Sequence, residues 1–248
     1  MLPLVSIVIP AYQEARRLPA TLAELARWAG EEAPGPVEVL IVVEHSRDGT
    51  LALAESAAAE HGHLWRAIDN GPQRGKGHAV RAGMLQATGD FIFYMDADLS
   101  VPLREVGAFL QRFREHPDLA LLAGSRQHAQ SRITRPQRWL RRSMGQTFNR
   151  ILAALTLAGI ADTQCGFKAF RRAAAHEIFR HQQLDGFAFD VEVLLLARKL
   201  GLPLGTMPVE WMNSPESHVH IARDSLRMLR DALRVRWMVA RRLRGTRP

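Results

Sequence analysis

Short apolar runs alternate with amphipathic stretches along the first half of the chain. The apolar runs are rich in β-branched residues and predict strands at 4–9, 37–43, 64–68, 90–95 and 119–123. The stretches between them predict helices at 14–28, 48–61, 75–87 and 102–115. Pro10 is expected to end the first strand. Strands and helices in this order predict an α/β fold around a mostly parallel sheet.

After Arg126 this alternation gives way to longer helical patterns. Apolar residues recur at helical spacing between 140 and 155 and again between 222 and 243, and arginines surround both stripes. The chain has no internal repeat, low-complexity tract or clear linker. We therefore expect one domain over 1–220, followed over 221–248 by a basic amphipathic helix that packs on the domain or on a membrane surface.

The positive charge of the chain is concentrated in the same two regions. The sequence has 33 basic and 25 acidic residues, a net charge of +8. Residues 119–161 contain seven arginines and no acidic residue, and residues 221–248 contain nine arginines and two aspartates. Such surfaces suit a polyanionic partner, such as an anionic lipid, a nucleic acid or a phosphorylated substrate.

Composition excludes several classes of protein. With 47% hydrophobic and 23% charged residues, the chain is neither disordered nor collagen-like. Cys165 is the only cysteine, so neither an internal disulfide nor a cysteine-based zinc site is expected. No apolar run reaches the roughly 20 residues of a membrane-spanning helix, and no signal peptide is recognisable. We expect a cytoplasmic protein, or one bound peripherally to the cytoplasmic face of a membrane.

Two carboxylates come directly after the predicted strand at 90–95. Asp96 and Asp98, separated by Ala97, should emerge at the carboxyl end of that strand, where open α/β sheets bind ligands. Two carboxylates suffice for Mg²⁺ or Mn²⁺ when pyrophosphate and water complete the coordination shell. A solvated acidic loop is the alternative interpretation.

Two further segments follow predicted strands. The R-G-K-G-H segment at 74–78 opens a helix, but it matches neither a P-loop nor a dinucleotide fingerprint. It is either a tight turn or a helix N-terminus that meets a phosphate. The S-R-D-G-T segment at 46–50 is typical of a turn that caps a helix. Before it, Glu44 ends a buried strand, where a hydrogen bond to a ligand would explain an otherwise costly carboxylate.

These segments, in this order, resemble the family 2 glycosyltransferases with the GT-A fold. Residues 9–14 read I-P-A-Y-Q-E, close to the family's I-P-A-Y-N-E, and 46–50, 74–77 and 96–98 resemble its D-D-G-S-x-D-G-T, R-G-K-G and D-x-D motifs. The resemblance implies a single Rossmann-like GT-A domain with amphipathic helical additions. The chain departs from the family at Gln13 and after the second strand, where Val43, Glu44 and His45 replace two aspartates and a glycine.

Motifs in the second half are similar to those of dolichyl-phosphate β-glucosyltransferases and the related mannose synthases. They are G-S-R at 124–126, D-T-Q-C-G-F-K at 162–168, F-D-V-E at 189–192 and P-V-E-W at 208–211. The resemblance implies inverting hexose transfer from a nucleotide sugar to a polyprenyl phosphate, with a divalent metal. UDP-glucose is the favoured donor, and GDP-mannose is the second choice.

The resemblance and the residue chemistry together assign the site. Donor binding is assigned to Pro10, Tyr12, Glu14, Glu44, Ser46, Lys76, Asp96 and Ala97, and metal binding to Asp96 and Asp98. Acceptor binding is assigned to Arg126, Arg138, Arg141, Arg142, Ser143 and Gln164, because guanidinium groups bind phosphate in a bidentate manner. The catalytic assignments are Asp98, Arg126 and Asp190.

The role of Asp190 depends on the acceptor. A phosphate monoester is mostly dianionic at neutral pH and needs cations more than a base. If the acceptor is a hydroxyl group, Asp190 is the expected general base. Otherwise Asp190 orients the donor sugar or caps a helix, and Cys165 is expected to serve packing.

Two alternatives keep the fold but change the function. One is a glycosyltransferase that acts on a soluble acceptor, and the other is a non-catalytic, nucleotide-binding subunit associated with a membrane. Specific nucleic-acid binding is the least favoured hypothesis, because the arginines lie in no recognisable nucleic-acid-binding framework.

Overall fold

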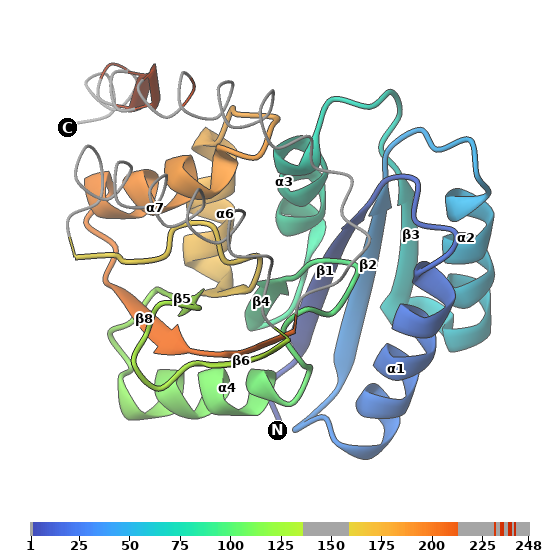
Figure 1. The fold of residues 1–248 in the computed structure, drawn as a ribbon, viewed down its shortest axis with the longest axis horizontal. Helices are drawn as coiled ribbons and strands as arrows, with labels where there is room; N and C mark the ends of the chain where they lie inside the picture. The colour runs from blue at the N-terminus through green and yellow to red at the C-terminus, as the bar shows by residue number, and fades with distance from the viewer. Residues whose placement is uncertain are drawn as a thin grey trace.

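The computed structural model describes residues 2–135 and 159–212, together with positions 231, 234, 235, 238, 239 and 241. Seven strands form a sheet in the order β3-β2-β1-β4-β7-β5-β8, and helices cover both of its faces (Figure 1). The sheet is mostly parallel, as the sequence predicts.

The first half of the chain contains the predicted βα units. Its elements are β1 (Val5–Ala11), α1 (Leu18–Glu31), β2 (Val37–Val43), α2 (Thr50–His61), a short 3₁₀ helix (Gly62–Leu64), β3 (Trp65–Asp69), α3 (Lys76–Gln86) and β4 (Phe91–Tyr94). β1 lies between β2 and β4 and is parallel to both. Each predicted strand and helix is present, and most boundaries shift by one to four residues.

The second half contains the helix predicted at 102–115 and the strand predicted at 119–123, and it then completes the sheet in a way that the sequence pattern does not predict. Its elements are α4 (Glu105–Glu115), β5 (Leu121–Ser125), β6 (Arg132–Arg135), β7 (Lys168–Arg171), α6 (Arg172–His181), α7 (Phe189–Lys199), β8 (Leu204–Pro208) and β9 (Glu210–Met212). β7 runs antiparallel between β4 and β5. β6 and β9 form a separate two-stranded parallel sheet.

Alternating strand residues supply two cores. Val5, Ile7 and Ile9 of β1 face a core that includes α1 and α4. Val8, between them, faces the other core, which includes α3, α6 and α7. Because every side chain of β2 is buried, both faces of the strand carry apolar residues.

Pro10 does not end the first strand, contrary to the prediction. β1 continues to Ala11, and Pro10 is in register with Val42 of β2. The carbonyl oxygen of Val8 accepts from Met95 N, so the backbone of Pro10, two residues on, also faces the β4 side. β4 ends at Tyr94, before the position opposite Pro10. The missing N–H of Pro10 therefore leaves no carbonyl group of β4 without a hydrogen bond.

The first helix begins at Leu18 rather than at Glu14. The carbonyl oxygen of Glu14 accepts from the backbone amides of Arg17 (2.9 Å) and Leu18 (2.8 Å), which forms a separate turn ahead of α1. Pro19 then occupies the first turn of α1, where its missing N–H costs no hydrogen bond.

Most residues of the helices predicted at 140–155 and 222–243 lie outside the described residues. The predicted boundary between a domain over 1–220 and a C-terminal helix stays a prediction. Val235 and Val239 are helical and buried, in the same core as α6 and α7. Neither valine is on the apolar stripe that the sequence indicated, which consists of Ala222, Leu226, Leu229, Leu233, Trp237 and Ala240. None of the helices in the described part combines the length and apolar character that crossing a membrane requires.

Candidate active site

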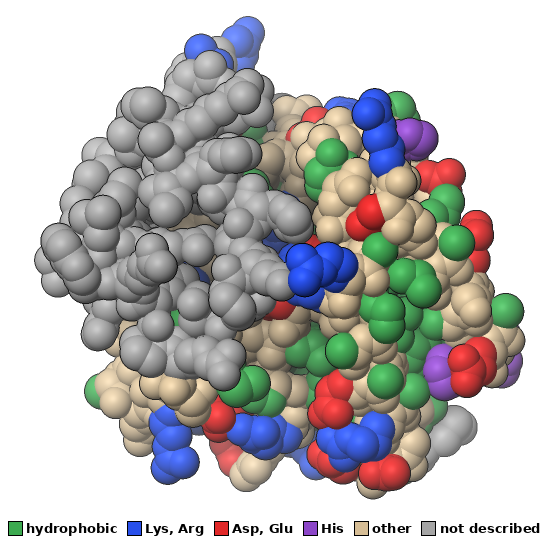
Figure 2. Space-filling model, turned by 45° about the vertical axis from the view of Figure 1, so that its right-hand side comes forward, with side chains coloured by type: hydrophobic (Ala, Val, Ile, Leu, Met, Phe, Trp, Pro, Cys, Tyr) green, Lys and Arg blue, Asp and Glu red, His purple; other side chains and the backbone are tan. Residues whose placement is uncertain are grey.

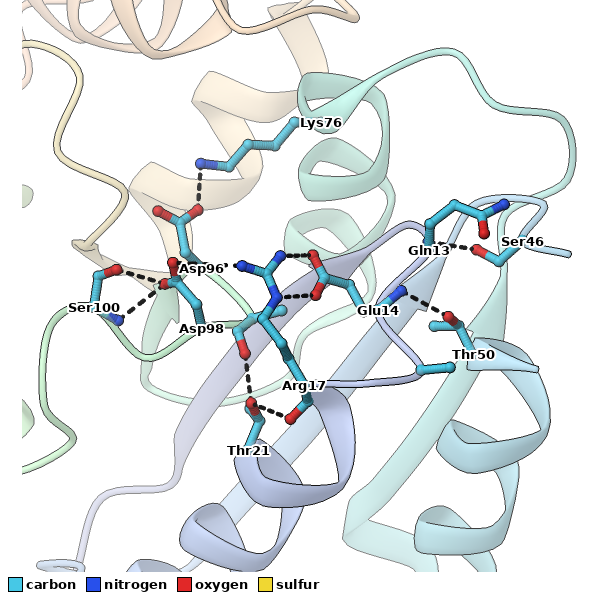
Figure 3. A network of polar contacts seen from close by, with 12 residues as sticks. Gln13, Glu14, Arg17, Thr21, Ser46, Thr50, Lys76, Asp96, Asp98 and Ser100 are labelled. Atoms are coloured by element: carbon cyan, nitrogen blue, oxygen red, sulfur yellow. Dashed lines mark hydrogen bonds and ion pairs between the residues drawn. The ribbon is translucent and has the colours of Figure 1, made fainter. Parts of the chain in front are cut away.

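The predicted site residues of the first half gather at one edge of the sheet. β1, β2 and β4 are parallel, so the segments that follow them leave the sheet at the same edge. The hydroxyl of Ser46, after β2, accepts from Gln13 N (3.0 Å) and donates to the carbonyl of Glu44 (2.8 Å), which ties the first two segments together (Figure 3). Pro10 and Tyr12 lie half-buried at the end of β1.

The D-x-D segment is held by its own backbone and by Ser100. Asp98 Oδ1 accepts from Ser100 N (3.0 Å) and from Ser100 Oγ (2.7 Å). Leu99 has a φ of 46°, a left-handed conformation that is uncommon for a residue with a side chain. Asp98 Oδ2 makes no hydrogen bond with the described residues, so this oxygen is available to a ligand.

Two cations flank the two carboxylates (Figure 3). Lys76 Nζ lies 2.5 Å from Asp96 Oδ1, and Arg17 Nη1 lies 3.9 Å from Asp98 Oδ2. Burial would lower the pKa of Lys76, but the charges of Asp96 and Asp190 outweigh it and raise that pKa above its usual value. The site therefore pairs each aspartate with a permanent positive charge.

Glu14, which the sequence assigns to donor binding, already makes hydrogen bonds within the protein. Its carboxylate accepts from Arg17 Nε (2.7 Å) and Arg17 Nη2 (2.5 Å), and its backbone N–H donates to Thr50 Oγ1 (2.9 Å). One helical turn beyond Arg17, Thr21 Oγ1 donates to the carbonyl of Ala97 (2.5 Å). Through Thr21, α1 thus supports the D-x-D segment directly.

Glu44 is not an unpaired carboxylate, contrary to the premise of its assignment. Its oxygens accept from Arg74 N (3.2 Å) and Gly75 N (3.1 and 3.0 Å), and His78 Nδ1 lies 3.1 Å from Oε1. A buried carboxylate is expected to have such partners. Glu44 therefore fixes the R-G-K-G turn, and its contact with a donor stays a prediction.

The amides at the start of α3 are also in use. The carbonyl of Asp185 accepts from Gly77 N (2.7 Å) and His78 N (3.2 Å). A Cβ atom at Gly77 would lie 2.2 Å from the carbonyl of Leu184, so only glycine permits this close approach. These two amides are not available to a phosphate, and the donor-binding role of Lys76, whose Nζ contacts Asp96, stays a prediction.

The backbone of Gly166 forms a wall against Asp96. A Cβ atom at this position would lie 2.1 Å from Asp96 Oδ2. A small hollow beside Asp96 is lined by Gly166, Ser100 and Trp211, among other residues. Residues from the second half thus close one side of the D-x-D segment.

Lys168 anchors this wall from the interior. Its side chain is fully buried, and Nζ donates to Asp190 Oδ1 (2.5 Å) and to the carbonyls of Cys165 (2.8 Å) and Thr163 (3.2 Å). The three donors of the ammonium group therefore all have acceptors. Because Cys165 immediately precedes Gly166, Lys168 holds the wall in place.

Asp190 belongs to the same buried cluster. Besides Lys168, the hydroxyl of Tyr94 donates to Asp190 Oδ1 (2.6 Å). Burial and the charge of Asp190 raise the pKa of Tyr94 well above its usual value, so the hydroxyl remains a donor. Ala188 rather than Asp190 precedes the first residue of α7, so Asp190 is not the residue that caps the helix. Its catalytic role stays a prediction.

The Arg126 guanidinium is already hydrogen-bonded to a carboxylate of the protein, that of Asp162. Its Nε and Nη2 donate to Asp162 at 2.8 and 2.9 Å, and its guanidinium lies 5.7 Å from the ring centre of Trp211. Burial would raise the pKa of Asp162, but Arg126 outweighs it and lowers that pKa. Gln164 follows Asp162 by two residues, and its Nε2 is buried without a hydrogen-bond partner in the described part of the protein. The acceptor-binding roles of Arg126 and Gln164 stay predictions.

The other residues assigned to acceptor binding lie outside the described residues; they are Arg138, Arg141, Arg142 and Ser143. Cys165 is buried, and burial raises the pKa of its thiol to about 11, which fits the expected packing role. Sequence reasoning missed Arg17 and Tyr94 and left Lys168 as a lesser candidate. The spacing of Arg17 three residues after Glu14, which brings side chains together on one turn, is the signal that was available.

Comparison with known proteins agrees with the family resemblance of the sequence motifs. The family model "Glycosyl transferase family 2" matches residues 6–179. A dolichyl-phosphate beta-glucosyltransferase of Dictyostelium discoideum is 31% identical over 240 residues, which cover 94% of this chain and 73% of that protein. One of Drosophila melanogaster is 32% identical over 235 residues, covering 91% and 72%.

Solved structures share the fold. Mannosyl-3-phosphoglycerate synthase from Rubrobacter xylanophilus superimposes with a TM-score of 0.67 at 22% identity, covering 98% of this chain and 75% of that one. Glucosyl-3-phosphoglycerate synthase from Mycobacterium tuberculosis, in complex with Mn²⁺, UDP and phosphoglyceric acid, gives a TM-score of 0.63 at 16% identity, covering 93% and 78%.

Proposed function

The chain belongs to glycosyltransferase family 2, and we propose that it transfers glucose from UDP-glucose to a polyprenyl phosphate, with inversion, at a membrane surface. Its curated relatives are named dolichyl-phosphate beta-glucosyltransferases, which supports the sugar and the lipid phosphate. The observation that carries the proposal is the D-x-D segment, with its two aspartates beside Lys76 and Arg17 at the ligand edge of the sheet.

The carboxylate oxygens of the D-x-D segment fit a hard divalent cation that binds together with a diphosphate. The described residues contain no group of three or more metal-ligating side chains, but Asp98 Oδ2 and the carboxylate of Asp96 face the same edge. Two carboxylates with diphosphate oxygens and water make a suitable shell for Mg²⁺ or Mn²⁺. Such an ion, when bound, stabilises the negative charge of the departing UDP. The solved glucosyl-3-phosphoglycerate synthase contains Mn²⁺ and UDP, in keeping with this choice.

The state of Asp190 favours a phosphate acceptor over a hydroxyl acceptor. A general base needs an oxygen that can reach the proton of the acceptor. Asp190 is buried, and its Oδ1 already accepts from Tyr94 and Lys168. A phosphate dianion attacks without such a base, so a phosphate acceptor agrees better with the observed contacts.

Attachment to the membrane is proposed from the basic segments of the sequence. The exposed charges of the described part are mixed: basic and acidic side chains lie beside one another along the lower rim of the face in Figure 2. Ion pairs such as Arg104–Glu210 and Arg112–Glu115 have this character. The two arginine-rich segments fall largely outside the described residues, and each carries a net charge of +7, against +8 for the whole chain.

The proposal is tested by incubating the protein with UDP-glucose, Mn²⁺ and a polyprenyl phosphate in detergent. We expect a glucosyl phospholipid with a β linkage, which proton NMR of the anomeric position identifies. Asp98→Asn is expected to abolish the product, as is an excess of EDTA. A product formed only from GDP-mannose would change the donor, and transfer only to water-soluble acceptors would overturn the lipid assignment.

A further inference from the structure

Arg17 occupies a special place in the site. Its guanidinium is bound on one side by both oxygens of Glu14 and faces Asp98 Oδ2 on the other, at 3.9 Å (Figure 3). That oxygen is the one that Ser100 leaves unused. Arg17 is therefore beside the atom of Asp98 that is best placed to bind a metal.

The surroundings hold Arg17 in this position. The Arg17 side chain is only 20% exposed. Its partner Glu14 is anchored through its backbone to Thr50, and the backbone carbonyl of Arg17 accepts from Thr21, whose hydroxyl also reaches Ala97. A bidentate arginine–carboxylate pair has a defined geometry. The charge of Arg17 is thus fixed next to the D-x-D segment before any ligand arrives.

This arrangement opposes the binding of a metal alone. A divalent cation at Asp98 would lie close to Arg17, and at Asp96 it would compete with Lys76. A diphosphate reverses the balance, because its negative charges attract both the metal and the two side chains. We propose that Arg17 is a positioning residue that makes divalent-metal binding depend on the diphosphate, an inference that rests on the proposed nucleotide-sugar function.

The expected effect is measurable. A unit positive charge about 5 Å from a divalent cation, in a medium as polar as water, raises the dissociation constant of that cation about tenfold. Removing the charge should therefore tighten the binding of Mn²⁺ to the nucleotide-free protein about tenfold. It should also weaken the binding of UDP, because the diphosphate loses a nearby positive charge.

The test measures Mn²⁺ binding by electron paramagnetic resonance, which reports the free ion, without and with saturating UDP. Three proteins are compared: wild type, Arg17→Met and Arg27→Met. Arg27 is a matched control, because it forms the same bidentate pair with Glu24 on α1, and no contact joins it to the D-x-D segment. We expect tighter Mn²⁺ binding without UDP in Arg17→Met alone, and wild-type behaviour in Arg27→Met.

Further variants separate the charge effect from damage to the fold. Arg17→Lys keeps the charge and should bind Mn²⁺ alone as weakly as wild type does. Because Arg17→Met frees Glu14, which could itself bind the ion, the double variant Glu14→Gln/Arg17→Met is compared with Glu14→Gln alone and must bind Mn²⁺ more tightly than that single variant does. A misfolded site would bind Mn²⁺ more weakly, in the opposite direction from the expected result.

The outcomes distinguish the two proposals. If wild type shows no Mn²⁺-dependent binding of UDP, the proposed function is wrong. If wild type binds both ligands but Arg17→Met binds Mn²⁺ alone no more tightly, the role of Arg17 is wrong and the function stands. If the double variant binds Mn²⁺ no more tightly than Glu14→Gln, the gain in Arg17→Met belongs to Glu14 and the role of Arg17 is overturned.

Discussion

Replacing Gly166 by alanine should inactivate the protein without unfolding it. The added Cβ atom would lie 2.1 Å from Oδ2 and 2.6 Å from Cγ of Asp96. Carbon and oxygen atoms that are not bonded need more than 3 Å, so the Asp96 carboxylate must move by about 1 Å or rotate away. Either movement breaks the contact between Asp96 and Lys76.

The costs to stability and to activity differ in size. The Asp96 side chain is 39% exposed, so it can turn into solvent, and the lost ion pair is worth at most about 1 kcal/mol. For a domain of this length that corresponds to a Tm change of roughly 2–4 °C. A ligand or reacting group displaced by about 1 Å can cost on the order of 100-fold in rate.

The assay combines thermal unfolding with initial rates of glucose transfer from UDP-glucose. We expect a Tm within a few degrees of wild type and kcat lower by about 100-fold. Gly186→Ala is the control, because a Cβ atom there meets nothing within 4 Å. Gly166→Ala with more than half of the wild-type rate would refute the wall that we assign to Gly166, and a loss of activity explained by unfolding would refute the separation of the two costs.

Three further predictions follow from the buried charges and the basic segments. Lys168→Met leaves Asp190 buried without its cation and should lower the free energy of unfolding by about 3–5 kcal/mol, measured with urea at pH 7. In Arg126→Met, the buried Asp162 loses the guanidinium that lowers its pKa, so the variant should be least stable relative to wild type near pH 7. This difference should shrink as the pH falls, because the variant's Asp162 becomes protonated first, and equal differences at pH 7 and pH 4.5 would contradict the reasoning. The full chain should sediment with vesicles that contain phosphatidylglycerol and lose this binding near 0.5 M salt, where the Debye length is roughly 4 Å, whereas equal binding to neutral vesicles would exclude an electrostatic attachment.

The sequence predicts the βα half of the fold well because local pattern decides it. The strand at 37–43 agrees with β2 residue for residue, and the aspartates Asp96 and Asp98 emerge where the pattern places them. In both cases a buried apolar run carries the signal, and parallel pairing then brings the strand ends together.

The second half is less predictable because distant contacts decide it. β7 carries Lys168 and Arg171 in a strand of four residues, and neither residue indicates a buried central strand. Lys168 is buried because Asp190 and two carbonyl groups, all outside β7, satisfy its ammonium group. No periodicity within one segment records such a partner.

The candidate site shows the same limit. The motif residue Glu44 matches the place of a family carboxylate, yet its partners include backbone amides 30 and 31 residues away in the chain. Arg17 matches no motif, and the role proposed for it comes from the position of Asp98, in the segment that follows β4. Sequence spacing locates the functional edge, but the fold decides which atoms there remain available to a ligand.

The placement of β7 also has a consequence for how the protein is made. β7 lies between β4 and β5, although it follows both in the chain. As the chain leaves the ribosome, β3, β2, β1 and β4 can assemble first, while β5 waits for β7 on one side and for β8 on the other. Unpaired strand edges invite pairing with other chains during that interval. The nascent protein therefore exposes the open edge of β4 until Lys168–Arg171 has been synthesised, and the Gly166 wall of the site closes in the same step.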